Sequence, residues 1–391
     1  MTSHSSPPSS DSEPWVLNTG LATFEFVRSL GQGNHGELML ALQRYNGCFS
    51  GHAVLKVLNS VIREQDYLRI LEEGQLGGRM RHDNIVSVRH LEGTVDNPIL
   101  ILEHIRGHRL SELLGLARRT GRALSEGFAC FVVAEVAEAL HHAHACVDED
   151  GRRLGIVHRD VTPYNILIGA RGEVKLADFG VAWSRLRGRV TSEGDFYPGS
   201  LAYSAPERAA LDHVDGRADL FSLGVILLQL LTGQHLFGAS ARFEAEVRSR
   251  VVRAKSEMPP RLGDLPGLEE MSPRRTRFLM RHIRGLSAEI VESATRGLPE
   301  GLQPILRKAL APKRDARYAQ GAELWADLRE YLWQGGGRFG KEVVVEEVAA
   351  LTEAAMRRLE DRPAPEAPPE GGGAPSGPKG PARPGRSRRR S

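Results

Sequence analysis

The sequence is poor in cysteine and lacks a long apolar run, and each shortage excludes a class of protein. Its three cysteines, Cys48, Cys130 and Cys146, are too few for a disulfide framework and match no metal-knuckle spacing, so a reducing compartment is expected. The longest apolar run, residues 221–231, is shorter than the about 20 residues that a bilayer span needs. Residues 1–14 have no apolar segment of a signal peptide. We therefore expect a soluble, cytoplasmic protein without a membrane span.

The chain also lacks a strong excess of charge, because its 391 residues carry a net charge of only +3. The two ends are nevertheless unusual in composition. Residues 1–14 are rich in Ser and Pro, and from residue 362 to residue 391 Pro, Gly and Arg dominate, so both segments are expected to be disordered. The basic C-terminal tail has no interleaved aromatic residues, which argues against nucleic acid. A solvated tail is the preferred interpretation, and contact with an acidic partner is the open alternative.

Between these ends, the hydrophobic pattern changes from strands to helices. Residues 21–103 contain short β-like segments, interrupted by one helical stretch over residues 62–80. Residues 106–334 are mostly helical, with an irregular insertion expected within residues 239–298. Residues 341–361 have apolar residues at helical spacing and predict a helical extension. A β-rich first lobe followed by a helical second lobe is a two-lobed α+β fold.

A glycine-rich segment lies near the start of the β-rich part. In LGQGNHGEL, residues 30–38, the glycines are Gly31, Gly33 and Gly36. Glycine allows the backbone to approach phosphate oxygens and to present N–H groups to them. A dinucleotide-binding fold would need a helix after the third glycine, and a strand-like segment follows instead. The segment therefore predicts either a phosphate-covering loop between two strands or a plain glycine-rich hairpin.

A strand lysine follows the glycine-rich segment. Lys56 in AVLKVL can reach phosphates from such a strand, although a single strand lysine is usually exposed to solvent. The following helix offers Glu72 and Glu73 as carboxylates, of which Glu73 is preferred as the partner of Lys56. The glycines of this helix each weaken it by about 1 kcal/mol relative to Ala. We therefore expect the helix to be mobile and the Lys56–Glu73 pair to form only in an activated state.

Two later segments carry acidic and amide side chains suited to phosphoryl transfer. In HRDVTPYN, residues 158–165, Asp160 can accept the proton of an attacking hydroxyl. Asn165 and Asp178, the latter in a DFG triplet, are hard oxygen ligands suited to Mg²⁺. The segment SAPE follows at residues 204–207.

In order and spacing, these motifs resemble those of the protein kinase superfamily, and most closely its bacterial-type serine/threonine branch, over residues 21–334. The resemblance implies a signalling enzyme that transfers phosphate from ATP, with Mg²⁺, to a protein substrate and to itself. It further implies that HRDVTPYN, residues 158–165, is the catalytic loop, that Asp219 holds this loop and that Arg317 pairs with Glu207. Leu102 would be the gatekeeper. The residues implied to contact ATP besides the glycines and Lys56 are Leu30, Leu38, Ala53, Glu103, Ile105 and Leu167.

The segment between DFG and SAPE resembles an activation loop. We expect autophosphorylation at Thr191 or Ser192, with Arg159 as the phosphate receiver. Ser200 stands where the family has a threonine that faces the substrate hydroxyl. The alternative is a Ser-rich loop that carries no phosphate.

Thr162 is the one serious departure, because the family carries lysine at this position. Exchanging a charged for a neutral hydrogen-bond donor costs on the order of 1–2 kcal/mol, roughly 5- to 30-fold in rate. Thr162 therefore lowers the rate, or another cation such as Arg187 or Arg189 compensates. A pseudokinase or nucleotide-binding scaffold is the open alternative, although Lys56, Asp160 and Asp178 are all present. A small-molecule phosphotransferase is disfavoured, because that class usually lacks the SAPE segment.

Overall fold

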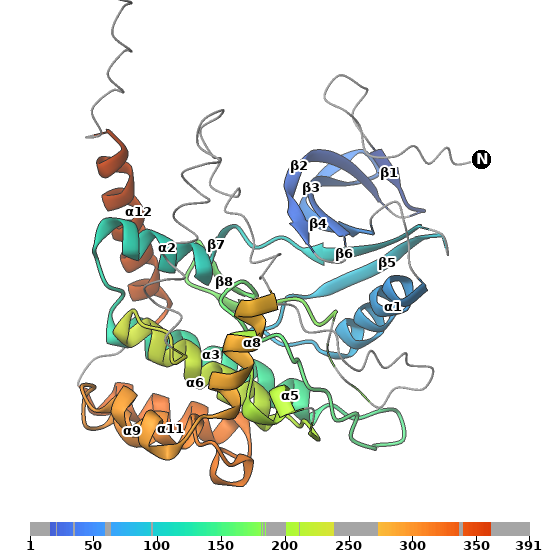
Figure 1. Cartoon of the computed structure of the whole chain (residues 1–391). Helices are drawn as coiled ribbons and strands as arrows, with labels where there is room; N and C mark the ends of the chain where they lie inside the picture. Colours follow the sequence, from blue (N-terminus) through green and yellow to red (C-terminus); the bar gives the residue numbers. More distant parts are fainter. Residues whose placement is uncertain are drawn as a thin grey trace, which may run out of the picture.

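The computed structural model describes residues 16–20, 22–33, 36–58, 64–94, 97–180, 182, 184, 201–210, 212–237, 273–335 and 339–360. Its strands gather at one end of the molecule and most of its helices at the other (Figure 1). This is the two-lobed α+β fold that the sequence predicts. Within the described residues, no helix is both long enough and apolar enough to cross a membrane.

The first lobe is built on an antiparallel sheet in the order β1-β2-β3-β4-β6-β5. Its strands are β1 (Val16–Asn18), β2 (Thr23–Gly33), β3 (Gly36–Tyr45), β4 (Cys48–Val57), β5 (Val88–Thr94) and β6 (Asn97–Glu103). One face of the sheet buries a compact core that includes Phe24, Met39 and Leu55. The sequence did not suggest β1, whose three residues are too few for a recognisable alternation.

Helix α1 (Glu64–Arg79) lies against β5 in this lobe (Figure 1). A Cβ at Gly77 would collide with the Val88 side chain, so glycine allows the helix to approach the strand closely. Ile70 and Leu100 join Leu58 in a small core beneath the helix. The glycines that lower the intrinsic stability of this helix therefore also permit its packing.

A three-stranded sheet stands at the junction of the lobes. It consists of β7 (Gly107–Arg109), β8 (Ile166–Gly169) and β9 (Val174–Leu176) in that order. Leu176 also forms a bridge with Ile85 of the first lobe. The Asn84 amide donates to the Val174 carbonyl oxygen at 2.9 Å and to Glu135 at 3.0 Å. These bonds join the chain leaving α1 to the second lobe.

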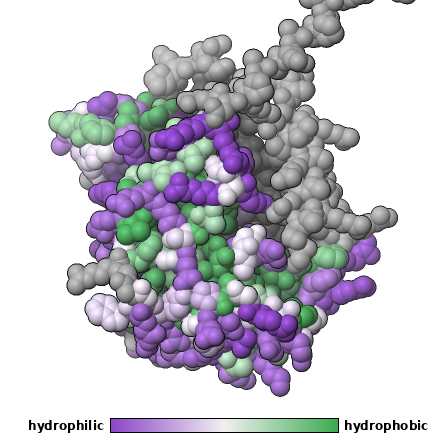
Figure 2. Space-filling view, turned by 90° about the vertical axis from the view of Figure 1, so that its left-hand side faces the viewer, coloured by the Kyte–Doolittle hydropathy of each residue, from purple (hydrophilic) through white to green (hydrophobic). Residues whose placement is uncertain are grey.

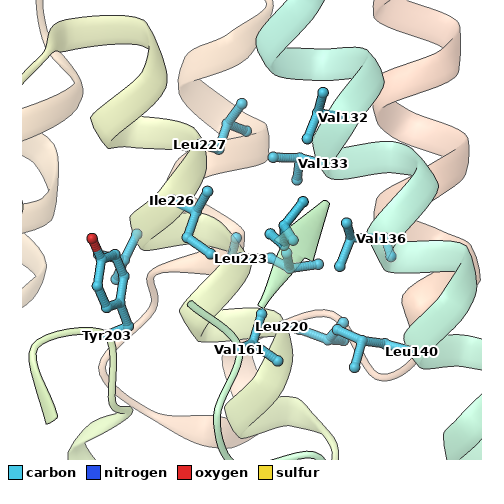
Figure 3. Close-up of a cluster of buried hydrophobic side chains, with 14 of the residues drawn as sticks. Val132, Val133, Val136, Leu140, Val161, Tyr203, Leu220, Leu223, Ile226 and Leu227 are labelled. Carbon is cyan, nitrogen blue, oxygen red and sulfur yellow. The ribbon is translucent and has the colours of Figure 1, made fainter. Parts of the chain in front are cut away.

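The second lobe is centred on two apolar helices, α3 (Glu126–Ala145) and α6 (Arg217–Thr232). Their facing side chains interdigitate, with Val133 and Val136 opposite Leu223 (Figure 3). Val161 lies beside Leu220 in the same cluster and is 1% exposed. The segment that contains Asp160 and Thr162 is thus attached to the main core through the residue between them.

The remaining helices surround this pair. They are α2 (Leu110–Thr120), α5 (Pro206–Ala210), α8 (Pro273–Arg284), α9 (Ala288–Thr295), α10 (Leu302–Ala309), the short 3-10 turn η1 (Arg314–Ala316), α11 (Gly321–Gln334) and α12 (Lys341–Glu360). Helix α12 lies against α2 and buries Val344 and Leu351 (Figure 1). Figure 2 views the molecule from this side, where hydrophilic residues dominate the described surface and hydrophobic residues show between them.

Candidate active site

The candidate site begins with Lys56, which lies between two carboxylates. Its ammonium Nζ is 2.7 Å from Glu73 Oε2 and 2.9 Å from Asp178 Oδ1. Burial lowers the pKa of Lys56, but the charges of the two carboxylates raise it more, so the pKa lies above its ordinary value. The lysine is therefore charged, and it links β4 and α1 to the segment after β9.

Strand β4 determines where Lys56 points. Alternate side chains of a strand face opposite sides of the sheet. Ala53, Leu55 and Val57 enter the core of the first lobe, so Lys56 lies on the other face. Its backbone pairs with Leu38 of β3 and Leu100 of β6, which fixes the lysine in the middle of the sheet.

Asp160 and Asn165 form the second part of the site. The Asn165 amide Nδ2 donates to both the backbone oxygen and Oδ2 of Asp160, at 2.8 Å each. The other carboxylate oxygen, Oδ1, is buried and has no hydrogen-bond partner among the described residues. Burial, and then the nearby charge of Asp178, raise the pKa of Asp160. One oxygen is thus held in place, while the other remains available to a further donor.

Asp219 of α6 holds the loop that carries Asp160. Its Oδ2 accepts from the His158 N–H at 2.8 Å, and its Oδ1 accepts from the Arg159 N–H at 2.9 Å. Arg159 has φ of 66°, a left-handed conformation that costs a non-glycine residue free energy. The expectation that Asp219 anchors this backbone is confirmed.

The DFG triplet also has a strained backbone. Asp178 has φ of 65°, and its Oδ1 accepts from the Gly180 N–H at 3.3 Å. Phe179 is 6% exposed and its ring lies 4.5 Å from the His158 ring, centroid to centroid. The apolar ring therefore packs on the catalytic loop, while the side chain of Asp178 remains 43% exposed beside Lys56.

The donor set of Asn165 and Asp178 suits a divalent cation. The Asn165 amide oxygen makes no hydrogen bond to the described residues, whereas its Nδ2 is occupied. Mg²⁺ is usually bound by one or two carboxylates together with substrate phosphates and waters. The described residues contain no cluster of three or more His, Cys, Asp or Glu that could hold a metal unaided. The two side chains fit a Mg²⁺ ion that brings phosphate oxygens with it.

The glycine-rich segment forms the adjoining ends of β2 and β3. Gly33 and Gly36 are paired across the two strands. Gly31 and Gly36 have φ of 127° and 153°, values that side-chain-bearing residues rarely adopt. A Cβ at Gly36 would also collide with the Val57 carbonyl oxygen, next to Lys56.

The candidate adenine residues lie on β2, β3, β4, β6 and β8, except Ile105, which lies in the segment between β6 and β7. In the sheet, Ala53 is opposite Glu103, and Leu38 is opposite Lys56. Ala53 is fully buried. The half-buried members of the set are Leu30, Leu38, Glu103, Ile105 and Leu167, and the gatekeeper candidate Leu102 is half-buried as well.

Sequence reasoning missed the role of the Glu103 side chain. Its Oε1 accepts from the Ser87 N–H at 2.7 Å and from Lys175 Nζ at 2.6 Å. Lys175 belongs to β9, so this carboxylate links β6 to the second lobe. Sequence reasoning also missed the contact of Ser184, whose hydroxyl donates to Glu72 of α1 at 3.0 Å. No spacing rule predicts either bond, because the partners are 72 and 112 residues apart.

Glu207 and Arg317 anchor the segment that ends in α5. The guanidinium forms two bonds to the carboxylate, at 2.7 and 2.8 Å, and the Arg317 side chain is fully buried. The guanidinium also lies over the Phe221 ring of α6, 4.8 Å from its centroid. The predicted pair is confirmed.

Of the remaining predicted residues, the structure describes Thr162 alone, and this residue is buried. Thr162 is only 3% exposed, and its carbonyl accepts from the Asn165 N–H at 3.0 Å. Several candidates lie outside the described residues: Thr191, Ser192, Ser200, Arg187 and Arg189. The basic tail and residues 1–14 lie outside them as well.

Comparison with known proteins gives matches over most of this chain. Residues 24–319 match the family model described as protein kinase domain. The chain is 30% identical over 335 residues to the tyrosine-protein kinase MasK of Myxococcus xanthus, covering 82% of this chain and 46% of MasK. It is 34% identical over 255 residues to the serine/threonine-protein kinase PknJ of Mycobacterium tuberculosis, covering 63% of this chain and 40% of PknJ. The chain therefore spans less than half the length of these relatives.

A solved structure with a similar fold is the kinase domain of PknI from Mycobacterium tuberculosis. The two superpose with a TM-score of 0.50 at 23% sequence identity, over 80% of this chain and 97% of that domain. At this identity, the similarity is informative about the fold alone.

Proposed function

The chain belongs to the protein kinase family, and from this premise we propose that it is an ATP- and Mg²⁺-dependent serine/threonine protein kinase. In this reaction the γ-phosphate of ATP passes to a hydroxyl of a protein substrate. The observation that supports it most directly is the network around Lys56, whose ammonium contacts Glu73 and Asp178 together. A scaffold that does not bind phosphates has no need of a buried cation joined to a half-exposed carboxylate.

In the proposed mechanism, Lys56 orients the phosphates under the glycine-rich segment. Asn165 and Asp178 would hold Mg²⁺, which supplies positive charge to the phosphate oxygens when bound. Leu30, Leu38, Ala53 and Leu167 would contact adenine, and the backbone of Glu103 and Ile105 would hydrogen-bond to it. Catalysis of this kind depends mainly on positioning and on stabilisation of charge.

Asp160 would receive the acceptor hydroxyl. Asn165 occupies one carboxylate oxygen, so the hydroxyl can donate to Oδ1, which lacks a partner among the described residues. A buried carboxylate oxygen without a partner is rare in a protein unless a ligand or water satisfies it. Asp160 would then take up the hydroxyl proton as the phosphoryl group is transferred.

The acceptor class is part of the proposal. PknJ is named a serine/threonine-protein kinase, whereas MasK is named a tyrosine-protein kinase. We further propose that Thr191 or Ser192 is autophosphorylated and contacts Arg159, and that Ser200 faces the acceptor. A cytoplasmic location is also proposed, supported by the absence of any disulfide among Cys48, Cys130 and Cys146.

The test is phosphate transfer from labelled ATP with Mg²⁺ to a generic protein acceptor and to the chain itself. Wild type is compared with Asp178→Ala, and with Asp150→Ala as a control at an exposed carboxylate. We expect wild type and the control to label equally and Asp178→Ala to lose the signal. Equal signals from all three, or none from several wild-type preparations, would favour the pseudokinase.

Acid hydrolysis of the labelled protein then separates the phosphoamino acids. We expect phosphoserine or phosphothreonine, and mass spectrometry should locate autophosphorylation at Thr191 or Ser192. Phosphotyrosine alone would contradict the serine/threonine assignment without affecting the kinase assignment. A segment 181–204 that stays unmodified in active protein would contradict the autophosphorylation site.

A further inference from the structure

Arg109 brings a guanidinium to the edge of the candidate active site from another element. It is the last residue of β7 and immediately precedes α2, and its Nη1 donates to the Tyr164 carbonyl oxygen at 3.4 Å. That carbonyl belongs to the peptide bond that leads into Asn165, whose amide holds the Asp160 carboxylate at 2.8 Å. The guanidinium therefore lies beside the catalytic loop, one residue from the asparagine that positions Asp160.

Backbone contacts fix this arrangement. Arg109 pairs with Leu167 across β7 and β8, and α2 lies beside these strands (Figure 1). The Ser111 N–H, in the first turn of α2, donates to the Pro163 carbonyl oxygen at 2.9 Å. Two consecutive carbonyls of the catalytic loop, those of Pro163 and Tyr164, thus accept hydrogen bonds from the start of α2. The backbone that carries Arg109 is therefore fixed relative to the loop.

Most of the Arg109 guanidinium is open to a further partner. The residue is half-buried, and a guanidinium has five N–H donors, of which one bonds to a described residue. The acidic residue in the first turn of α2 is Glu112. Its Oε2 accepts from the backbone N–H of Arg109 at 3.2 Å and lies 3.5 Å from His108 Nδ1. Among the described residues, the Arg109 guanidinium therefore has no ion pair.

Tyr164 presents an aromatic ring and a hydroxyl at the same place. It is 39% exposed, although the three residues before it in the catalytic loop are buried. Its hydroxyl makes no hydrogen bond to the described residues. Among those residues, the charges that act on this hydroxyl are the positive charges of Arg118 and Arg109. Tyr164 and the arginines therefore form a surface of hydrogen-bond donors with positive charge, next to Asp160.

We propose that Arg109 and Tyr164 are specificity-determining residues, which bind an acidic side chain of the acceptor segment close to the hydroxyl that receives phosphate. This inference rests on the proposed kinase function, and it names the class of substrate as a segment with glutamate or aspartate near its serine or threonine. A carboxylate accepts hydrogen bonds from a guanidinium and from a phenol, and those to the guanidinium are strengthened by charge. A lysine in the same place would be repelled by the charges of Arg109 and Arg118.

The test compares three peptides that differ only in the residues around a single serine, which are glutamates, glutamines or lysines. At saturating ATP, kcat/KM is measured for each peptide with wild type, Arg109→Gln, Arg109→Glu and a control, Arg122→Gln, at an exposed arginine beyond the other end of α2. We expect wild type to prefer the glutamate peptide to the glutamine peptide by about fivefold, as for an ion pair at a half-exposed position, with the difference in KM for the peptide. Arg109→Gln should lose this preference, Arg109→Glu should shift it toward the lysine peptide, and Arg122→Gln should keep it.

Further measurements separate this role from a structural role and from a role in nucleotide binding. The KM for ATP of Arg109→Gln should stay at the wild-type value. A raised KM for ATP with an equal loss for all three peptides would show that Arg109 serves the nucleotide or the fold, and would contradict the proposal. Arg109→Lys retains the charge and should retain the preference, which keeps the test decisive if thermal melting shows that Arg109→Gln does not fold. Tyr164→Phe removes only the hydroxyl and should weaken the preference, whereas an unchanged preference contradicts the part of Tyr164.

The same peptides with alanine in place of serine are also tested as inhibitors of autophosphorylation. The preference is then measured even if no peptide accepts phosphate. An active wild type that treats the three peptides alike, or that favours the lysine peptide, contradicts the role of Arg109. A wild type that transfers phosphate neither to itself nor to any acceptor contradicts instead the proposed function.

Discussion

Among single side chains, Glu73 has one clear task, which is to hold the Lys56 ammonium through a contact of 2.7 Å. Replacing Glu73 with Gln keeps the size of the side chain and removes one charge. A hydrogen bond to a charged group contributes about 1.5–3 kcal/mol, so we expect kcat/KM to fall roughly 10- to 150-fold. Steady-state kinetics at saturating Mg²⁺ measures this. Glu149→Gln, at an exposed carboxylate, should retain wild-type activity, and equal losses in both variants would argue against a specific role.

Gly36 is required for a different reason, since both its backbone and its surroundings exclude a side chain. Its φ of 153° disfavours alanine, and a Cβ would meet the Val57 carbonyl oxygen. Such backbone strain costs of order 1–3 kcal/mol, so Gly36→Ala should lower the denaturant midpoint and raise KM for ATP. Gly20→Ala, where no atom lies within 4 Å, is the control. An unchanged KM for ATP in folded Gly36→Ala would show that this part of the hairpin does not approach the nucleotide.

Helix α12 behaves as part of the second lobe rather than as a free extension. Glu347 accepts from the Ser125 hydroxyl at 2.7 Å at the start of α3, and Phe339, just before α12, packs on Phe131 with ring centroids 5.8 Å apart. Leu351 is 1% exposed between these elements. We therefore propose that the folded unit extends through residue 360, beyond the match of the family model.

A pair of substitutions on α12 tests this packing. Leu351→Ala should reduce the free energy of unfolding by about 2–5 kcal/mol, because it leaves a cavity against the lobe. Met356 on the same helix is 58% exposed, so Met356→Ala should change it by less than about 0.5 kcal/mol. Chemical denaturation measures both, and similar small effects would mean that α12 detaches readily.

Across the whole molecule, Asp219 connects the main helical core to the catalytic loop. Besides two loop N–H groups, its Oδ2 lies 2.9 Å from His144 Nε2 on α3. Burial raises the pKa of Asp219, but the bond to His144 and the other donors lower it more, so the net shift is downward. A depressed pKa means that the folded state binds the proton less tightly than the unfolded state. The stability from this group is therefore present above the unfolded pKa and is lost as pH falls through the folded one.

We expect Asp219→Asn to be less stable than wild type at pH 7, by about 1.5–3 kcal/mol for the charged hydrogen bonds that it loses. The difference should shrink as pH falls below about 3.9, the ordinary pKa of aspartate, because wild type then loses the same charge. Urea unfolding at pH 7 and at acidic pH measures both quantities, with Asp212→Asn as a control at an exposed carboxylate. A stability difference independent of pH would contradict the depressed pKa.

The order of the lobes and the main helices could be predicted because these depend on local pattern. Apolar periodicity over residues 124–146 and 219–231 corresponds to α3 (Glu126–Ala145) and α6 (Arg217–Thr232). The short strands β1, β7 and β9 have three residues each, which is too few to show a hydrophobic period. They form because they pair with neighbouring strands, β1 with β2 and both β7 and β9 with β8. Expectations for Thr191, Ser192 and Ser200 stay predictions, because these residues lie outside the described ones.

The sequence by itself determined which side chains are candidates for the chemistry, because Lys56, Asp160 and Asp178 stand in short motifs whose spacing is set along the chain. Only the tertiary structure decided what each of them touches. Lys56 meets Asp178 across 122 residues, and Arg208 meets the catalytic loop across 49. Such contacts depend on how the lobes and α5 pack, which no local pattern encodes. The burial of Thr162, which is only 3% exposed, is likewise decided by the fold and not by the motif in which it stands.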